Sequence, residues 1–186
     1  MKRLVVITVG KTHSGKSTFA QALEQQLHES LVIDQDNHAE FLGTYYRRLL
    51  PKQGPNTIKY SITRAIVDHA VRQTDAHLIL CNSNSYGQGR SELLEYFHKE
   101  GFISILVYFD LPDLVLEERV AHSQRSKTIF RAASSFKEVL DRQQYESLNN
   151  PNVTAPAEGE ANHLLVIKNS DEVREIIRKI VTIANN

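Results

Sequence analysis

The sequence predicts one α/β domain in which helices cover both faces of a parallel sheet. Apolar runs of strand length alternate with stretches of helical periodicity along all 186 residues, a pattern typical of parallel strands joined by crossover helices. The run Ile103 to Phe109 is almost entirely apolar, as expected for a strand covered on both faces. Because no break in composition marks a second domain, residues 1–186 are expected to fold as a single unit.

The first two predicted strands are separated by one helix. An apolar run at residues 3–9 predicts the first strand, and residues 16–29 have the periodicity of a helix. Residues 31–33 predict a short second strand, which ends in the polar run Asp34-Gln35-Asp36-Asn37.

Two helices are expected before the third strand. Helical patterns over about residues 38–50 and 57–75 are separated by Pro51-Lys52-Gln53-Gly54-Pro55, a strong break. Residues 77–81 predict the third strand. Cys81, at its end, is expected to be a packed strand residue rather than a nucleophile.

The alternation continues through the middle of the chain. A polar loop over residues 82–89 leads into a helix over about 90–100, which Gly101 is placed to end at its C′ position. Residues 103–109 form the fourth predicted strand, and Pro112 suits the first turn of the next helix.

The C-terminal part completes the sheet. Residues 149–162, rich in Asn, Pro, Ala and Gly, are expected to form a flexible surface loop. Residues 164–167 predict the last strand and residues 171–183 a closing amphipathic helix. Asn169, with a glutamate three positions later, can cap that helix.

Charge and cysteine content limit the class of partner and the compartment. The 22 basic and 22 acidic residues balance to a net charge of zero. The overall composition therefore gives no indication of a nucleic-acid track or an anionic membrane as the partner, and a local basic patch stays open. A single cysteine excludes an internal disulfide framework. No apolar run approaches the length of a membrane span. A cytoplasmic location is therefore expected.

The most specific motif is Gly10-Lys11-Thr12-His13-Ser14-Gly15-Lys16-Ser17, which fits the phosphate-binding pattern G-x-x-x-x-G-K-[ST] between a strand and a helix. The glycines let successive backbone N–H groups point at one place, while Lys16 can reach the outer phosphates and Ser17 can bind Mg²⁺. The motif predicts ATP and Mg²⁺ as cofactors and leaves GTP open. A glycine-rich turn without nucleotide is the alternative. The expected nucleotide-binding residues are Gly10, Lys11, Thr12, His13, Ser14, Gly15, Lys16, Ser17, Thr18 and Arg119.

Two carboxylates follow the second strand. In an open parallel sheet the carboxyl ends of strands line the ligand crevice, so Asp36 is expected to accept the proton of a substrate hydroxyl that attacks a γ-phosphate. Two alternatives stay open for Asp34 and Asp36: holding Mg²⁺ through water, or capping a helix that begins at Asn37.

A basic stretch after the fourth strand predicts a lid over about residues 119–134. Arg119 and Arg125 are expected to close over the γ-phosphate, where they would stabilise its charge and exclude water. A solvated helix face is the alternative. Gln143, Gln144 and Glu146 follow this stretch and are candidates for ordering it, or are simply exposed.

The motifs together resemble the small P-loop kinases of the phage-type polynucleotide 5′-hydroxyl kinase group, within the AAA-type P-loop NTPase superfamily. The resemblance is carried by three parts of the chain. The first is the start, Lys2 to Gly10 and Ser14 to Ala20, and the second is Ile33 to Asn37. The third is a succession in matching order and spacing: Asn82 to Asn84, Arg90 to Gly101, Phe109 to Pro112 and the lid segment Arg119 to Lys127. It implies a three-layer fold with strand order 2-3-1-4-5, an acceptor hydroxyl near Asp36 and contact of Arg125 with the transferring phosphoryl group. Lys16, Asp36 and Arg125 are thus the expected catalytic residues.

The chain departs from this family at several positions. Asn82 stands where members usually carry an aspartate, and an amide cannot act as a base. His38-Ala39-Glu40 replaces the arginine that members use to hold substrate phosphate, a role that Arg47 or Arg48 could fill. In the phosphate loop, family members commonly carry Gly-x-Pro where this chain has Lys11-Thr12-His13. This replacement would add positive charge near the phosphates.

The acceptor site is expected in residues 38–75, where basic and aromatic side chains could hold an acceptor or could be packing residues. They are Tyr45, Tyr46, Arg47, Arg48, Lys59, Tyr60 and Arg64. Zero net charge favours a small-molecule acceptor over a nucleic-acid 5′ end. A regulatory protein that binds nucleotide with little transfer activity is the alternative of a different class, motivated by Asn82.

Overall fold

A computed structural model describes residues 2–185. The strands are β1 (Leu4–Val9), β2 (Ser30–Asp34), β3 (His77–Cys81), β4 (Ile103–Phe109) and β5 (His163–Ile167). The helices are α1 (Lys16–Glu24), α2 (Gln35–Tyr45), α3 (Thr57–Gln73), α4 (Gly87–Lys99), α5 (Asp113–Ala121), α6 (Phe136–Asn149) and α7 (Val173–Ala184), with short 3-10 turns at η1 (Arg47–Leu49) and η2 (Ser170–Glu172).

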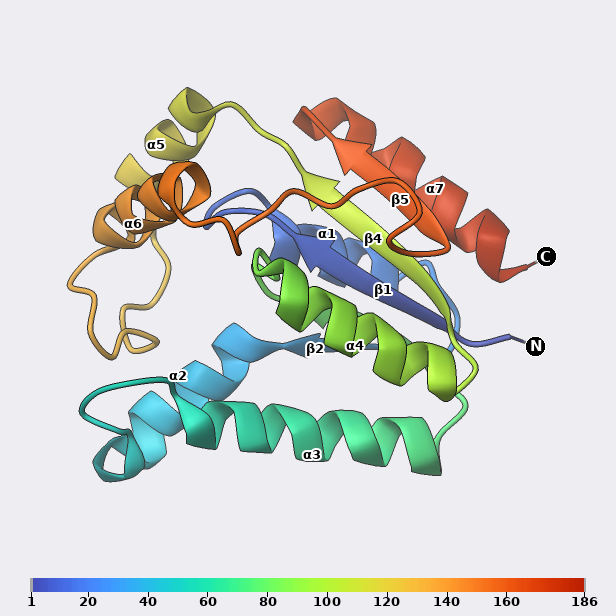
Figure 1. The fold of residues 1–186 in the computed structure, drawn as a ribbon, viewed down its shortest axis with the longest axis horizontal. Coiled ribbons are helices and arrows are strands. Elements are labelled where there is room, and N and C mark those ends of the chain that lie inside the picture. Colours follow the sequence, from blue (N-terminus) through green and yellow to red (C-terminus); the bar gives the residue numbers. More distant parts are fainter. Residues whose placement is uncertain (1, 186) are drawn as a thin grey trace.

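The five strands form one parallel sheet in the order β2-β3-β1-β4-β5. β1 lies in the centre, with Val6 beside Ile79 of β3 and Ile105 of β4. The carboxyl ends of the strands all point toward the end of the molecule where α2, α5 and α6 gather (Figure 1). The predicted α/β class and strand order are confirmed.

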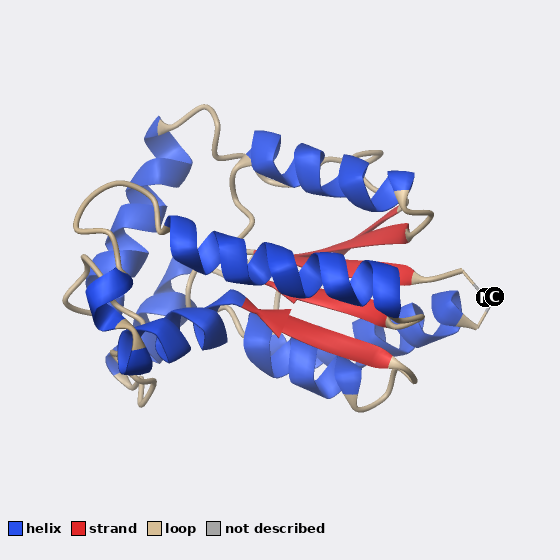
Figure 2. Ribbon diagram, turned by 90° about the horizontal axis from the view of Figure 1, so that it is seen from below, coloured by secondary structure: helices blue, strands red, loops and turns tan. Residues whose placement is uncertain are grey.

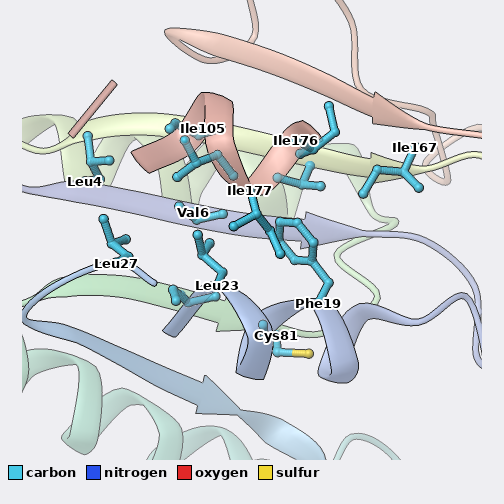
Figure 3. Packing of buried hydrophobic residues seen from close by; sticks show 14 of the residues in the cluster. Leu4, Val6, Phe19, Leu23, Leu27, Cys81, Ile105, Ile167, Ile176 and Ile177 are labelled. Carbon is cyan, nitrogen blue, oxygen red and sulfur yellow. The ribbon is translucent and has the colours of Figure 1, made fainter. Parts of the chain in front are cut away.

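Helices cover the two faces of the sheet in separate layers (Figure 2). Because successive strand residues point to opposite faces, Val5 and Ile7 pack against α3 and α4, while Leu4 and Val6 pack against α1 and α7. Figure 3 shows this second cluster. Cys81 belongs to it and is buried, which confirms its expected packing role.

A third cluster joins α5 to α6 at the carboxyl edge of the sheet. It consists of Leu116, Val120, Phe136 and Leu140. Between these helices, residues 122–135 form neither helix nor strand. The apolar contact therefore holds both ends of this irregular segment beside the sheet.

Some helix boundaries differ from those predicted. α1 ends at Glu24 rather than near residue 29. The predicted end was too late because Leu27, which lies beyond the helix, is also buried and continues the apolar spacing. α2 begins at Gln35, directly after β2, because the Asp34 side chain accepts a hydrogen bond from the Asp36 N–H and caps it.

The remaining caps agree with the sequence or shift by a residue. Gly101 follows the last residues of α4, and its N–H donates to the carbonyl of His98 at 3.1 Å, as predicted. Pro112 occupies the position just before α5 rather than its first turn. The Asn169 side chain caps η2, which precedes α7.

The segment expected to be a flexible loop is tied to the rest of the fold. Val153 pairs with Tyr86 as an isolated bridge, and Glu160 accepts from the guanidinium of Arg90 at 2.6 Å. Arg90 is almost fully buried, and a buried charge needs a counter-charge. This requirement, invisible in the composition of the segment, holds the loop in place.

Within residues 2–185, none of the helices combines the length and the apolar character that crossing a bilayer requires.

Candidate functional site

A cleft of about 950 Å³ opens at the carboxyl edge of the sheet. Its walls come from the phosphate loop, the ends of β2 and β3, the first turn of α3, the segment between α5 and α6, and the chain after β5. Among the predicted nucleotide-binding residues, Thr12 to Thr18 and Arg119 line it, whereas Gly10 and Lys11 lie outside its lining.

The phosphate loop takes a shape that depends on its glycines. Gly10 has φ +151°, and a Cβ there would lie 3.0 Å from the Cβ of Phe109. Gly15 has φ +98° and precedes α1, whose first turn has no side-chain cap. Lys16, Ser17 and Thr18, the first residues of α1, line the cleft, and the uncapped N-terminus of a helix favours anions.

Lys16 lies in the loop as a partly buried cation. Its Nζ donates to the Lys11 carbonyl at 2.6 Å and to Ser14 Oγ at 3.2 Å, and burial lowers its pKa to about 8. Lys11 points elsewhere, since its Nζ pairs with Asp113 Oδ1 at 2.6 Å. The extra charge expected from Lys11 is therefore neutralised on α5.

His13 links the loop to the segment between α5 and α6. Its Nε2 lies 2.7 Å from Ser123 Oγ and its Nδ1 lies 3.0 Å from Thr12 Oγ1, while its ring packs edge-on to Phe136. Burial, assisted by the cations Arg125, Lys16 and Arg119, lowers the pKa of His13 to about 4. His13 is consequently neutral near pH 7 and adds no positive charge.

Ser17 and Asp34 form a pair of oxygen donors. Ser17 Oγ donates to Asp34 Oδ2 at 2.8 Å, and Asp34 is buried at the end of β2. A hydroxyl and a carboxylate suit Mg²⁺, which prefers oxygen ligands and retains water and phosphate in its shell. Among the described residues, no group of three or more His, Cys, Asp or Glu side chains could hold a metal, so these two donors would act with phosphate and water.

Cys81 lies beside this pair. Its Sγ is 3.6 Å from Ser17 Oγ, and burial raises its pKa to about 12. The thiol is therefore protonated at neutral pH and poorly suited to nucleophilic chemistry.

Asp36 and Arg125, 89 residues apart in the chain, form an ion pair. Arg125 Nη2 lies 2.7 Å from Asp36 Oδ2, and both side chains are partly exposed. The Arg125 guanidinium also lies over the ring of Phe136, 5.2 Å from its centre. Because Asp34 caps α2, the Asp36 carboxylate is free of that role and faces the cleft.

Arg119 and Arg131 anchor the predicted lid at its two ends. Arg119 Nη1 donates to the His13 carbonyl at 3.1 Å and Nη2 donates to Ser170 Oγ at 2.9 Å. Arg131 donates to the carbonyls of Pro51 and Gly54. The segment between α5 and α6 thus reaches from the phosphate loop to the connection between α2 and α3.

Several contacts of the site carried no clear sequence signal. Gln143 Oε1 accepts from the Thr12 N–H at 2.7 Å, so this side chain orders the phosphate loop, whereas the sequence suggested that it orders the lid. Asn82 Nδ2 donates to Gln35 Oε1 at 3.0 Å beside the cleft. A glutamine on a helix face has many ordinary explanations, which is why spacing alone did not single it out.

The predicted acceptor residues divide into two groups. Lys59 and Tyr60, in the first turn of α3, line the cleft. The others lie outside its lining, and Tyr45 is 72% exposed. Phe41 packs against Tyr45 and Tyr46 on the outer surface of α2 instead.

Comparison with known proteins identifies the family and the fold. A family profile described as "AAA domain" matches residues 5–147, and no curated protein sequence matches the chain.

Solved structures resemble the chain over nearly its whole length. A protein from Chloroflexus aurantiacus, named as a candidate kinase, has a TM-score of 0.68 at 16% identity, covering 98% of each chain. The APS kinase of Mycobacterium tuberculosis, solved with AMPPNP and APS, has a TM-score of 0.61 at 18% identity, covering 100% of this chain and 99% of its own. A gluconokinase from Sinorhizobium meliloti has a TM-score of 0.57 at 17% identity, covering 97% and 90%. At these identities the likeness establishes a P-loop kinase fold.

Proposed function

The chain belongs to the AAA domain family, and from that premise we propose that it is an ATP- and Mg²⁺-dependent phosphotransferase that acts on a hydroxyl of a small molecule. The observation that carries the proposal is the Asp36–Arg125 pair in the cleft that the phosphate loop lines. A carboxylate suits a hydroxyl acceptor, and a guanidinium suits a transferring phosphoryl group.

The phosphate loop is assigned to the nucleotide. Its backbone N–H groups and Lys16 would bind the β- and γ-phosphates. Ser17 and Asp34 would hold Mg²⁺, which when bound neutralises phosphate charge. Arg119, between the loop and Ser170, would fix the start of the lid against the nucleotide.

Asp36 and Arg125 are assigned to the transfer itself. The acceptor oxygen forms a bond to the γ-phosphorus as the bond to the β–γ bridging oxygen breaks and ADP leaves. The acceptor proton passes to the Asp36 carboxylate. Arg125 shifts from Asp36 to the γ-phosphoryl oxygens, whose negative charge it stabilises. Residues 119–134 act as the lid and residues 38–75 supply the acceptor site.

A small molecule is the favoured acceptor. APS kinase and gluconokinase, which share the fold, act by their names on small molecules, and the chain has no net charge for tracking nucleic acid. The narrower assignment to polynucleotide 5′-hydroxyl kinases stays a prediction. A regulatory nucleotide-binding protein is the second candidate, supported by Asn82, an amide in the cleft that pairs with Gln35.

The test is an ATP-consumption screen over hydroxyl-bearing metabolites and 5′-hydroxyl oligonucleotides. Lys16→Ala should weaken ATP binding, while Asp36→Asn should leave it within about twofold and lower kcat by about 10²–10⁴-fold. Asp141→Asn removes an exposed carboxylate of α6 and serves as the control, with no expected effect.

Two results would contradict the proposal. One is an acceptor-stimulated turnover that neither Lys16→Ala nor Asp36→Asn reduces. The other is slow ATP turnover that no acceptor stimulates, together with a partner protein that binds only the nucleotide-loaded form; this outcome supports the regulatory candidate.

A further inference from the structure

The cleft holds more positive charge than a magnesium–nucleotide complex would balance. Its described lining contains six cations, Lys16, Lys59, Arg119, Arg125, Arg131 and Arg142, against two carboxylates, Asp34 and Asp36. A nucleoside triphosphate with one bound Mg²⁺ carries a net charge of about −2. The excess lies in one place on a chain whose total charge is zero.

Most of these cations already have partners. Lys16 and Arg119 hold carbonyls of the phosphate loop, Arg125 pairs with Asp36, and Arg131 holds two carbonyls before α3. Lys59 and Arg142, by contrast, take part in no ion pair within residues 2–185. The two lining cations without an ion-pair partner therefore lie on α3 and α6.

Lys59 lines the same cleft as Asp36, the carboxylate to which the acceptor hydroxyl is assigned. Its ammonium lies 4.9 Å from the centre of the Tyr60 ring. Asp34 lines this cleft as well. Burial lowers the pKa of Lys59, and the two carboxylates oppose this effect.

The turn that carries Lys59 is fixed relative to Asp36. Thr63 Oγ1 donates to the Lys59 carbonyl at 3.0 Å and also contacts His38 Nδ1, on α2, at 2.8 Å. The two helices that carry Lys59 and Asp36 are thus tied together by Thr63, one turn beyond Lys59, and His38, two residues beyond Asp36. A ligand that contacts both Lys59 and Asp36 would therefore bind between two helices whose separation is already fixed, which lowers the entropic cost of binding.

We propose that the acceptor is a small hydroxyl compound bearing an anionic group (carboxylate, sulfate or phosphate) that Lys59 binds, with Arg142 on the α6 wall as the second cation. This inference rests on the proposed phosphotransferase function and names its substrate class. A neutral acceptor would leave a half-buried ammonium without a direct ion-pair partner, which is costly. An anionic acceptor removes that cost, and its charge would orient the hydroxyl toward Asp36.

The test measures anion binding independently of turnover. The protein is first saturated with AMPPNP and Mg²⁺, so that the phosphate loop is occupied, and then titrated calorimetrically with sulfate, phosphate, gluconate and the neutral polyol sorbitol. The three anions distinguish a sulfate, phosphate or carboxylate group, and sorbitol reports hydroxyl binding alone. Lys59→Met removes the charge and Lys59→Arg keeps it. Lys99→Met removes an exposed lysine of α4, outside the cleft lining, as the control.

At least one anion should bind the loaded protein more tightly than sorbitol. Lys59→Met should weaken that binding by about tenfold or more, since a charge-assisted hydrogen bond is lost. Lys59→Arg should restore most of it, and Lys99→Met should leave it unchanged.

The inference is overturned if the AMPPNP-loaded protein binds no anion better than sorbitol, or if Lys59→Met binds anions as tightly as the unmodified chain. Either result leaves the proposed phosphotransferase standing. Failure of AMPPNP to bind in the first step contradicts the proposed function instead, and the inference with it.

Discussion

Gly10 directly follows β1 in a backbone conformation that few other residues adopt. A Cβ at this position would lie 3.0 Å from Phe109 Cβ, 3.1 Å from the Phe109 carbonyl oxygen and 3.1 Å from Ser14 Oγ. Two of these contacts are with a fixed strand, which cannot move away as a flexible side chain would. The requirement for glycine is therefore steric as well as conformational.

Gly10→Ala is expected to destabilise the fold by about 1–3 kcal/mol, because strain and crowding add. Urea denaturation followed by circular dichroism measures the change. Gly89→Ala is the matched control: it lies in α4 with nothing near its would-be Cβ, and it should stabilise by about 0.5–1 kcal/mol. Equal stability of the two variants would contradict the steric argument.

His13 makes stability depend on pH. Its folded pKa of about 4 lies below its ordinary value of 6.5, so between these values the unfolded chain binds more protons than the folded one. The contribution of His13 is complete above pH 6.5 and is lost as the pH falls toward 4.

His13→Asn should therefore show a weaker loss of stability between pH 6.5 and 4 than the unmodified chain. Asparagine tolerates the left-handed backbone that His13 adopts, with φ +59°. Denaturant midpoints measured across this range test the prediction. His163→Asn, on an exposed strand end, is the control, and identical pH profiles for both variants would refute the role given to His13.

At the scale of elements, the buried Arg90 explains why residues 150–162 follow a defined path. Its side chain is 1% exposed and pairs with Glu160 at 2.6 Å, and its Nη1 donates to the carbonyls of Asn84 and Thr154. One guanidinium thus connects α4, the end of β3 and the loop before β5.

Glu160→Gln should cost about 3 kcal/mol, because it leaves the buried guanidinium without a counter-charge. Thermal unfolding should show a Tm lowered by roughly 6–12 °C. Glu158→Gln, at an exposed position of the same loop, should change Tm little. If the two variants unfold together, the pair does not hold the loop.

The starting point of α2 also matters for the chemistry. The sequence suggested that Asp34 and Asp36 both precede a helix at Asn37, whereas α2 begins at Gln35. Asp34 consequently caps the helix and accepts a hydrogen bond from Ser17, while Asp36, two residues later, pairs with Arg125. A shift of two residues in the helix boundary separates a candidate metal ligand from a candidate base.

At the scale of the molecule, the cleft joins parts that are distant in the chain. The phosphate loop, the first turn of α3, the segment between α5 and α6, and the chain after β5 all line it. A ligand that contacts several of these parts binds the folded state only, so it should stabilise the whole molecule.

AMPPNP with Mg²⁺ at about 100 times its Kd should raise the unfolding free energy by about 2.7 kcal/mol, a Tm increase of roughly 5–10 °C. Differential scanning calorimetry measures it. Removing Mg²⁺ with EDTA should reduce the shift, and Lys16→Ala should reduce it further, whereas Lys99→Met should not. A full shift in Lys16→Ala would contradict the nucleotide assignment.

Much of the fold was predictable because its signals are local. Each of these signals depends on a few neighbouring residues: the apolar runs, the Pro- and Gly-containing break before α3, Gly101 at the end of α4, and the phosphate loop. The exact ends of α1 and α2 were not predictable, because Leu27 packs outside a helix and Asp34 combines a strand end with a cap. Boundaries depend on competition between neighbouring elements.

The sequence by itself determined the α/β class, the order of elements and the loop that suits a nucleotide, since periodicity and spacing act within one element at a time. The tertiary structure alone decided that Asp36 meets Arg125, that Gln143 holds the Thr12 N–H, and that Lys59 rather than Tyr45 reaches the cleft. These outcomes depend on how separate helices pack on the sheet, because packing sets which side chains from distant segments share one space.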